Sequence, residues 1–138
     1  MVETSLAALL EREHRHLDEL FGRFLGAASA GNSAAAREAI AAFDDELGRH
    51  TAFEEARAIP APEGHNLAPP EAEAQDARLF RELRLEHVQV REVSSMIRRL
   101  LEEKSDLEGA RRLAPNLARR WDAHTTREER ELFPGVRP

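Results

Sequence analysis

Two histidines in this chain are each followed, four residues later, by a glutamate: His50 by Glu54 and His124 by Glu128. Residues four apart lie on one face of a helix with ~5 to 6 Å between their Cβ atoms, so each pair offers a nitrogen and an oxygen to the same small volume. The sequence contains no cysteine and no tyrosine. A metal bound by this chain would therefore be held by imidazole and carboxylate groups.

These residues, with His14 and His87, fall on helical stripes of apolar side chains. Apart from one step of seven, from Val90 to Ile97, the stripes advance by three or four residues, the spacing of a helix face that is buried in a core. The four stripes are Leu6, Leu10, His14, Leu17, Phe21, Phe24 and Ala28; Ala36, Ile40, Phe43, Leu47, His50 and Glu54; Phe80, Leu83, His87, Val90, Ile97 and Leu101; and Leu113, Leu117, Trp121, His124 and Glu128. Four histidines and two glutamates are therefore expected to point into one interior.

The composition predicts the fold that would position them. Alanine (23) and leucine (17) far outnumber valine plus isoleucine (8), which favours helices over strands. Apolar periodicity predicts four helices, at about residues 5–29, 34–58, 71–103 and 105–135. The 138 residues are expected to form a single domain over residues 1–138, an all-α, up-down-up-down four-helix bundle.

Turn and cap residues separate the predicted helices. Gly31-Asn32 is expected to end the first helix, with Ser33 as the N-cap of the second. The loop at residues 59–70 carries four of the seven prolines, so no helix is expected to cross it. Ser105 opens a capping-box pattern for the fourth helix, and Pro115 predicts a kink or a short break inside that helix.

The chain also repeats itself. Residues 50–60 and 124–134 share five identical positions, among them the histidine, both glutamates and the final proline, at an offset of 74. An offset of 73 places Leu10, Glu13, His14 and Leu17 on Leu83, Glu86, His87 and Val90. The bundle is therefore expected to consist of two similar helical hairpins.

Counting residues from one end of this bundle places the four core histidines at the same depth, roughly 23 to 27 Å at ~1.5 Å per residue. Glu54 and Glu128 would lie on diagonal helices, where they can bridge two metal ions while two histidines bind each ion. The alternative is a set of hydrogen-bonded core residues without metal. Two unpaired buried carboxylates would cost several kcal/mol each, and a pair of cations would offset that cost. A dinuclear metal site is the favoured interpretation.

Some polar residues and glycines outside the stripes have two interpretations. Gly22 and Gly26 are expected either to lower the stability of the first helix, or to let helices approach closely or open a passage to the site. His16 and His65 are expected at the surface rather than at the metal. Four glutamates beside the core histidines are either a charged flank or acceptors for the second imidazole nitrogen: Glu13, Glu55, Glu86 and Glu129.

Charge and hydropathy exclude other classes of protein. A net charge of −6 has the wrong sign for a grip on nucleic-acid phosphates. No apolar stretch is longer than the five residues 6–10, against the ~20 that a membrane span needs, and Glu3 stands where a signal peptide would have basic residues. A soluble cytoplasmic protein is expected, and the sequence leaves its oligomeric state open.

The chain resembles the hemerythrin-like HHE cation-binding family in its pattern of His14, His50-x3-Glu54, His87 and His124-x3-Glu128. The resemblance covers essentially the whole chain and implies two iron ions joined by an oxo or hydroxo bridge. It implies further that His14 and His50 bind one iron, that His87 and His124 bind the other, and that Glu54 and Glu128 bridge them. Zinc and manganese suit the same donors.

One histidine of the oxygen-carrying members of that family is missing. Those proteins have a further histidine on the third helix in an HxxxH arrangement, whereas here Leu83 precedes His87 by four residues and Arg91 follows it by four. One iron is then expected to keep an open position or to recruit a substitute ligand such as Glu86. A hydrogen bond from Arg91 to an anionic ligand is a further hypothesis.

Three functions are compatible with such a centre. The favoured one is a di-iron protein that binds O2, NO or peroxide at the open position, for sensing, storage or protection. The first alternative is an enzyme that turns over peroxide or nitric oxide, although the sequence shows no proton donor besides the ligands and their neighbouring glutamates, and so no catalytic residue is assigned. The second alternative is an iron-homeostasis sensor whose stability reports metal occupancy.

Overall fold

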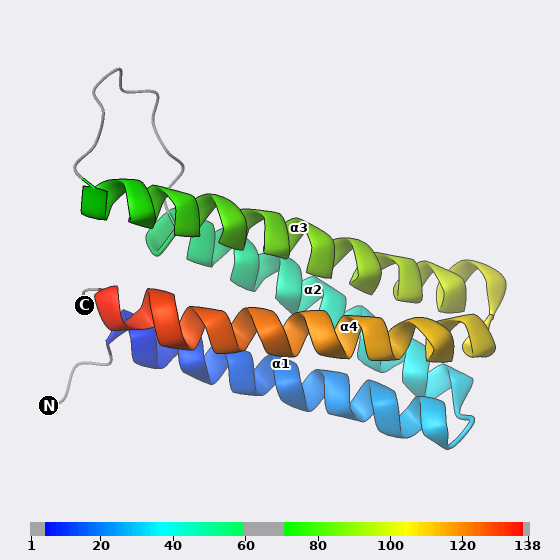
Figure 1. Cartoon of the computed structure of the whole chain (residues 1–138). Coiled ribbons are helices and arrows are strands. Elements are labelled where there is room, and N and C mark those ends of the chain that lie inside the picture. Colours follow the sequence, from blue (N-terminus) through cyan, green and yellow to red (C-terminus); the bar gives the residue numbers. More distant parts are fainter. Residues whose placement is uncertain (1–4, 60–70, 137–138) are drawn as a thin grey trace, which may run out of the picture.

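Helices make up the described part of the chain (Figure 1). The computed structural model describes residues 5–59 and 71–136, and these residues contain no strand. The helices are α1 (Leu6–Ser29), α2 (Ser33–Arg57), α3 (Glu71–Lys104) and α4 (Leu107–Arg127), followed by a π-helical turn, η1 (Glu128–Leu132), and a 3-10 turn, η2 (Phe133–Gly135). None of these helices is both long and apolar enough to cross a membrane.

Each helix packs against the next one along the chain, and α1 also contacts α4, which closes the bundle. The α1–α2 and α3–α4 turns lie at one end of the bundle, and the start of α1 and the end of η2 lie at the other (Figure 1). The predicted all-helical, up-down-up-down four-helix bundle is confirmed. The proline-rich loop falls on residues 60–70, outside the described residues, and so does His65.

The turn between α1 and α2 differs by one residue from its prediction. Gly31 has a positive φ of 75°, and the N–H of Asn32 donates to the carbonyl of Ala27 at 2.9 Å, which ends α1. Asn32 Oδ1 then accepts from the N–H of Ala35 at 3.1 Å. Asn32 is therefore the N-cap, and Ser33, the predicted cap, is the first helical residue.

The predicted cap at Ser105 is also wrong by one residue. Ser105 has a φ of 49°, and the N–H of Asp106 donates to the carbonyl of Leu100 at 2.9 Å. These are the features of a left-handed helix stop, so Ser105 serves to end α3. Asp106 Oδ1 accepts from the N–H of Gly109 at 2.8 Å and caps α4 in its place.

Helix α4 is continuous through Pro115, so the predicted short break is absent. Pro115 is exposed, while Ala114 and Leu117 on either side of it are buried. The proline therefore lies on the outer face of α4 and leaves the core face intact, although it cannot donate to the carbonyl of Arg111.

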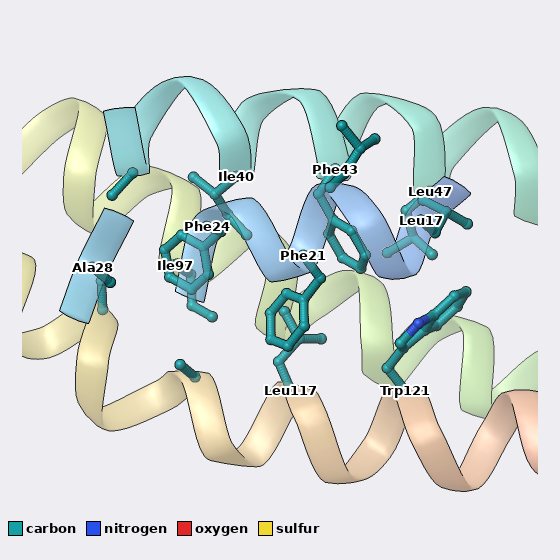
Figure 2. Close-up of a cluster of buried hydrophobic side chains, with 14 of the residues drawn as sticks. Leu17, Phe21, Phe24, Ala28, Ile40, Phe43, Leu47, Ile97, Leu117 and Trp121 are labelled. Carbon is teal, nitrogen blue, oxygen red and sulfur yellow. The ribbon is translucent and has the colours of Figure 1, made fainter. Parts of the chain in front are cut away.

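Two separate apolar clusters fill the interior. The larger cluster contains Phe21, Phe24, Phe43 and Trp121, and Figure 2 shows these rings packed between α1, α2 and α4. The aromatic rings of Phe21 and Phe43 lie 5.4 Å apart, and those of Phe43 and Trp121 lie 5.9 Å apart. The smaller cluster lies near the start of α1 and comprises Leu10, Ala58, Ile59, Leu83, Leu132 and Phe133.

The glycines of α1 generate a prediction about stability. A Cβ at Gly22 or Gly26 would have no atom within 4 Å, so their interpretation as points of close helix approach is wrong. Replacing either with alanine should raise the free energy of unfolding by about 0.5–1 kcal/mol, because alanine loses less backbone entropy in a helix. Urea unfolding measures this effect.

Gly109→Ala is the matched control for these substitutions. There a Cβ would collide with the Asp106 carboxylate that caps α4, so the free energy of unfolding should fall. A loss of stability at Gly22 or Gly26 would contradict the exposed, uncrowded positions that the structure gives them.

Candidate metal centre

Six polar side chains form a layer between the two apolar clusters. The four histidines are at most 2% exposed, and both glutamates are fully buried. Their nitrogen and oxygen atoms form two groups within 4.8 Å, and the two glutamates belong to both groups. The groups are His14, His50, Glu54 and Glu128; and His87, His124, Glu54 and Glu128. The structure thus brings together all six residues predicted as ligands.

Glu54 divides its two carboxylate oxygens between the histidine pairs. Oε2 lies 3.1 Å from Nε2 of His50 and 3.7 Å from Nε2 of His14. Oε1 accepts a 2.8 Å hydrogen bond from Nε2 of His87. The carboxylate therefore faces one pair with each oxygen, which is the arrangement that a bridging ligand requires.

Glu128 repeats this division from the diagonal helix. Its Oε1 lies 3.0 Å from Nε2 of His14, whereas its Oε2 lies 3.1 Å from Nε2 of His124 and 3.3 Å from Nε2 of His87. The two carboxylates thus lie side by side between the two histidine pairs.

Several atoms that face this interior have no hydrogen-bond partner. These atoms are buried. Carboxylate oxygens and imidazole nitrogens approach one another within 3.0 to 3.1 Å, but the angles do not fit hydrogen bonds. Each unpaired buried polar group costs about 1–3 kcal/mol. The atoms are Nε2 of His14, His50 and His124, Oε2 of Glu54 and Oε1 of Glu128. Imidazole nitrogens and carboxylate oxygens oriented in this way fit a pair of cations.

The backbone carbonyl of each buried glutamate accepts a hydrogen bond from the residue five positions later. The N–H of Ile59 donates to the carbonyl of Glu54 at 2.9 Å, and the N–H of Phe133 donates to the carbonyl of Glu128. Hydrogen bonds across five residues are typical of π-turns, which occur at the C-terminal ends of helices. Ile59 and Phe133 are both buried, and the ring of Phe133 lies 5.3 Å from that of His14. The repeated segments therefore form the same turn, which apolar periodicity did not predict.

Outer carboxylates hold three of the four imidazoles through Nδ1. Their hydrogen bonds are His50 to Glu13 at 2.6 Å, His87 to Glu55 at 2.8 Å and His124 to Glu86 at 2.8 Å. Glu129 lies 3.8 Å from Nδ1 of His14, too far for a hydrogen bond. Of the two interpretations for these glutamates, the acceptor role therefore holds for three.

Two arginines behind these carboxylates were missed in the sequence. Arg84 donates to Glu55 at 2.8 Å, and Arg127 donates to Glu86 at 2.7 Å. Each arginine lies three residues from a core histidine, on the flank of the same helix. That spacing is the signal that could have indicated them, but the carboxylate that each one contacts comes from another helix.

Charge inside the cluster shifts its proton affinities. Burial lowers the pKa of His14, but contacts with Glu128 and Glu54 outweigh burial and raise it to about 9. The same opposing effects raise the pKa of His87 to about 10. Burial raises the pKa of Glu54, but close contacts, those with Glu128 and His14 foremost, outweigh it and hold the pKa well below its usual range. Without metal, the imidazoles of His14 and His87 thus carry protons that a bound cation would displace.

Other candidate residues lie outside the layer. His16 is exposed. Arg91 is also exposed, and its guanidinium lies 3.6 Å from where a Cβ on Gly48 would be, on the outside of α2. Glu86 uses one oxygen for His124 and the other for Arg127, so it does not act as a substitute ligand in this arrangement.

Comparison with known proteins agrees with this geometry. A family model described as the Hemerythrin HHE cation binding domain matches residues 5–136. Neither the curated proteins nor the solved structures compared with the chain include a significant match.

The unpaired atoms generate a prediction about stability. Removing metal with a chelator should lower the melting temperature on the order of 10 °C, because a ligand at a hundredfold excess over its Kd contributes about 2.7 kcal/mol. Thermal denaturation of the loaded and chelated protein measures the difference. A Glu54→Gln/Glu128→Gln double variant should lose this response, and an unchanged wild-type melt would contradict a buried metal pair.

The pKa shifts generate a second prediction, for the metal-free protein. The pKa values of His14 and His87, about 9 and about 10, lie above the ordinary 6.5, so their contribution to stability is complete below pH 6.5. It is lost as the pH rises through both values, so the free energy of unfolding should fall from about pH 6 to about pH 10. Urea unfolding across this range tests it, and a flat profile would contradict it.

Proposed function

The chain belongs to the hemerythrin HHE cation-binding domain family, and on that premise we propose that it is a non-haem di-iron protein. One iron would be held by His14 and His50 and the other by His87 and His124. Glu54 and Glu128 would bind both ions. The observation that carries this proposal is the division of each carboxylate between the two histidine pairs.

The donor set supports iron with open coordination positions. Each ion is offered two imidazoles and one oxygen from each of two carboxylates, which is fewer than the six ligands of an octahedral ion. Two histidines with carboxylate and open positions are typical of non-haem iron sites. His16 is the only other histidine in the described part of the chain, and it is exposed, so it adds no ligand.

The surroundings of the layer favour a small ligand. Leu10, Ile59, Leu83 and Phe133 cover one side of it, and Trp121 lies on the other, and all five are buried. A ligand of two or a few atoms, such as O2, NO or peroxide, fits so enclosed a site. Bound irons would supply Lewis acidity and electrons for such a ligand.

The buried hydroxyl groups of the described residues are already hydrogen-bonded, which favours binding over turnover. Thr51 and Thr125 donate to backbone carbonyls of their own helices, at 3.3 Å each. Ser94 donates to Asp44 at 2.8 Å. These contacts occupy the hydroxyl protons, so none of them serves as a proton donor to a ligand. The protein's own part is then to hold the ions, orient the imidazoles and exclude bulk water, with turnover of peroxide or NO as the alternative.

Spectroscopy of the iron-loaded protein tests the proposal. We expect an ultraviolet-visible charge-transfer band that changes when azide is added, because a small anion would occupy the open position. Arg98→Ala is the control and should leave the azide response unchanged, because Arg98 pairs with Asp44, Asp45 and Glu102 rather than with a residue of the layer. Binding of zinc alone, with no iron band, would contradict a di-iron centre, and rapid consumption of peroxide would favour the enzyme.

A further inference from the structure

The two histidine pairs differ in the hydrogen bonds that their Nδ1 atoms make with the outer carboxylates. In the pair from α3 and α4, both imidazoles donate through Nδ1 to carboxylates, His87 to Glu55 and His124 to Glu86, each at 2.8 Å. An imidazole held in this way keeps its tautomer and ring orientation before any metal arrives.

The pair from α1 and α2 has only one such contact. His50 donates to Glu13 at 2.6 Å, whereas Nδ1 of His14 is buried and has no hydrogen-bond partner. Ring packing holds His14 instead, with the rings of Phe133 and Trp121 at 5.3 and 5.6 Å. Aromatic packing restricts the position of the ring, but it does not select the nitrogen that carries the proton.

A second layer of contacts widens the difference. Arg84 joins Glu55 to the carbonyl of Ile59, which accepts at 2.9 Å. Arg127 joins Glu86 to Glu82 and Glu131. Among residues 5–59 and 71–136, no lysine or arginine forms an ion pair or a hydrogen bond with Glu13 or Glu129. The His87–His124 side thus has two arginine–glutamate–histidine relays, and the His14–His50 side has none.

We propose that the two metal positions differ in retention, with one ion kept between His87 and His124 and the other exchanging at His14 and His50. The centre would load stepwise, and a stable one-metal form would have its ion between His87 and His124. The exchangeable position would take a divalent cation and so respond to its concentration. This inference rests on the proposed two-metal centre.

The arginines have two opposing effects on the relayed imidazoles. An arginine beside a carboxylate partly neutralises its negative charge. By itself this would weaken the imidazole that donates to that carboxylate as a metal ligand. The same arginine fixes the carboxylate, so less rotamer entropy is lost when the metal binds. Each arginine is itself held by a second group, Ile59 for Arg84 and Glu82 for Arg127, which adds to the positioning effect. The proposal requires positioning to be the larger of the two effects.

Titration of the metal-free full chain with Co2+ tests the proposal, with circular dichroism to verify the fold. The wild type should show two binding steps whose affinities differ by roughly tenfold or more. His14→Gln should remove the weaker step and leave the tighter one, whereas His124→Gln should remove the tighter one. Because these variants change ligands one at a time, they assign each step to a position.

Substitution of the relay arginines tests the cause of the difference. Arg84→Gln/Arg127→Gln should weaken the tighter step by roughly tenfold and leave the weaker step unchanged. Arg98→Gln is the matched control, since Arg98 also pairs with several carboxylates, those of Asp44, Asp45 and Glu102, but does not contact the outer glutamates. If the double variant fails to fold, Glu86→Gln supplies the same comparison with one relay removed.

The outcomes separate this inference from the proposed function. Two Co2+ steps of equal affinity, loss of the tighter step in His14→Gln, or tighter binding after arginine removal would overturn unequal retention while leaving the two-metal centre intact. Failure of the wild type to bind Co2+ would overturn the proposed function, and the inference with it.

Discussion

Two carboxylates buried in the interior of an apolar bundle are the constraint on which the rest of the structure depends. Glu54 and Glu128 have no exposed surface, and a buried charge without compensation would cost several kcal/mol. Groups of alternating charge surround these two carboxylates in successive layers. The carboxylate pair is surrounded by four imidazoles, three of these donate outward to further carboxylates, and two of those carboxylates are bound by arginine. A pair of cations would complete the innermost layer.

The apolar clusters give this polar layer its shape. The larger cluster, with Trp121 at its border, fixes the helices on one side, and the smaller cluster, with Ile59 and Phe133, covers the other side. Ile59 and Phe133 reach their places because the backbone closes a five-residue turn on the carbonyl of each buried glutamate. The same turn thus places each buried glutamate and covers it with a bulky apolar residue.

Much of this architecture could be predicted because helical periodicity determines which residues share a face. It gave the four helices, and matched depth brought the six polar residues to one level. The caps were wrong by one residue because Gly31 and Ser105 adopt left-handed conformations that shift the next start to Asn32 and Asp106. The relays could not be predicted, because Arg84 and Arg127 contact carboxylates on other helices, and spacing along one helix does not show such contacts.

A crystal structure of the iron-loaded protein with anomalous scattering at the iron edge would show whether the six residues hold two metal ions. A two-metal centre should give two anomalous peaks, one beside His14 and His50 and one beside His87 and His124, with Glu54 and Glu128 contacting both. A structure without a peak in this layer, in which the imidazoles and carboxylates pair only with one another, would contradict it.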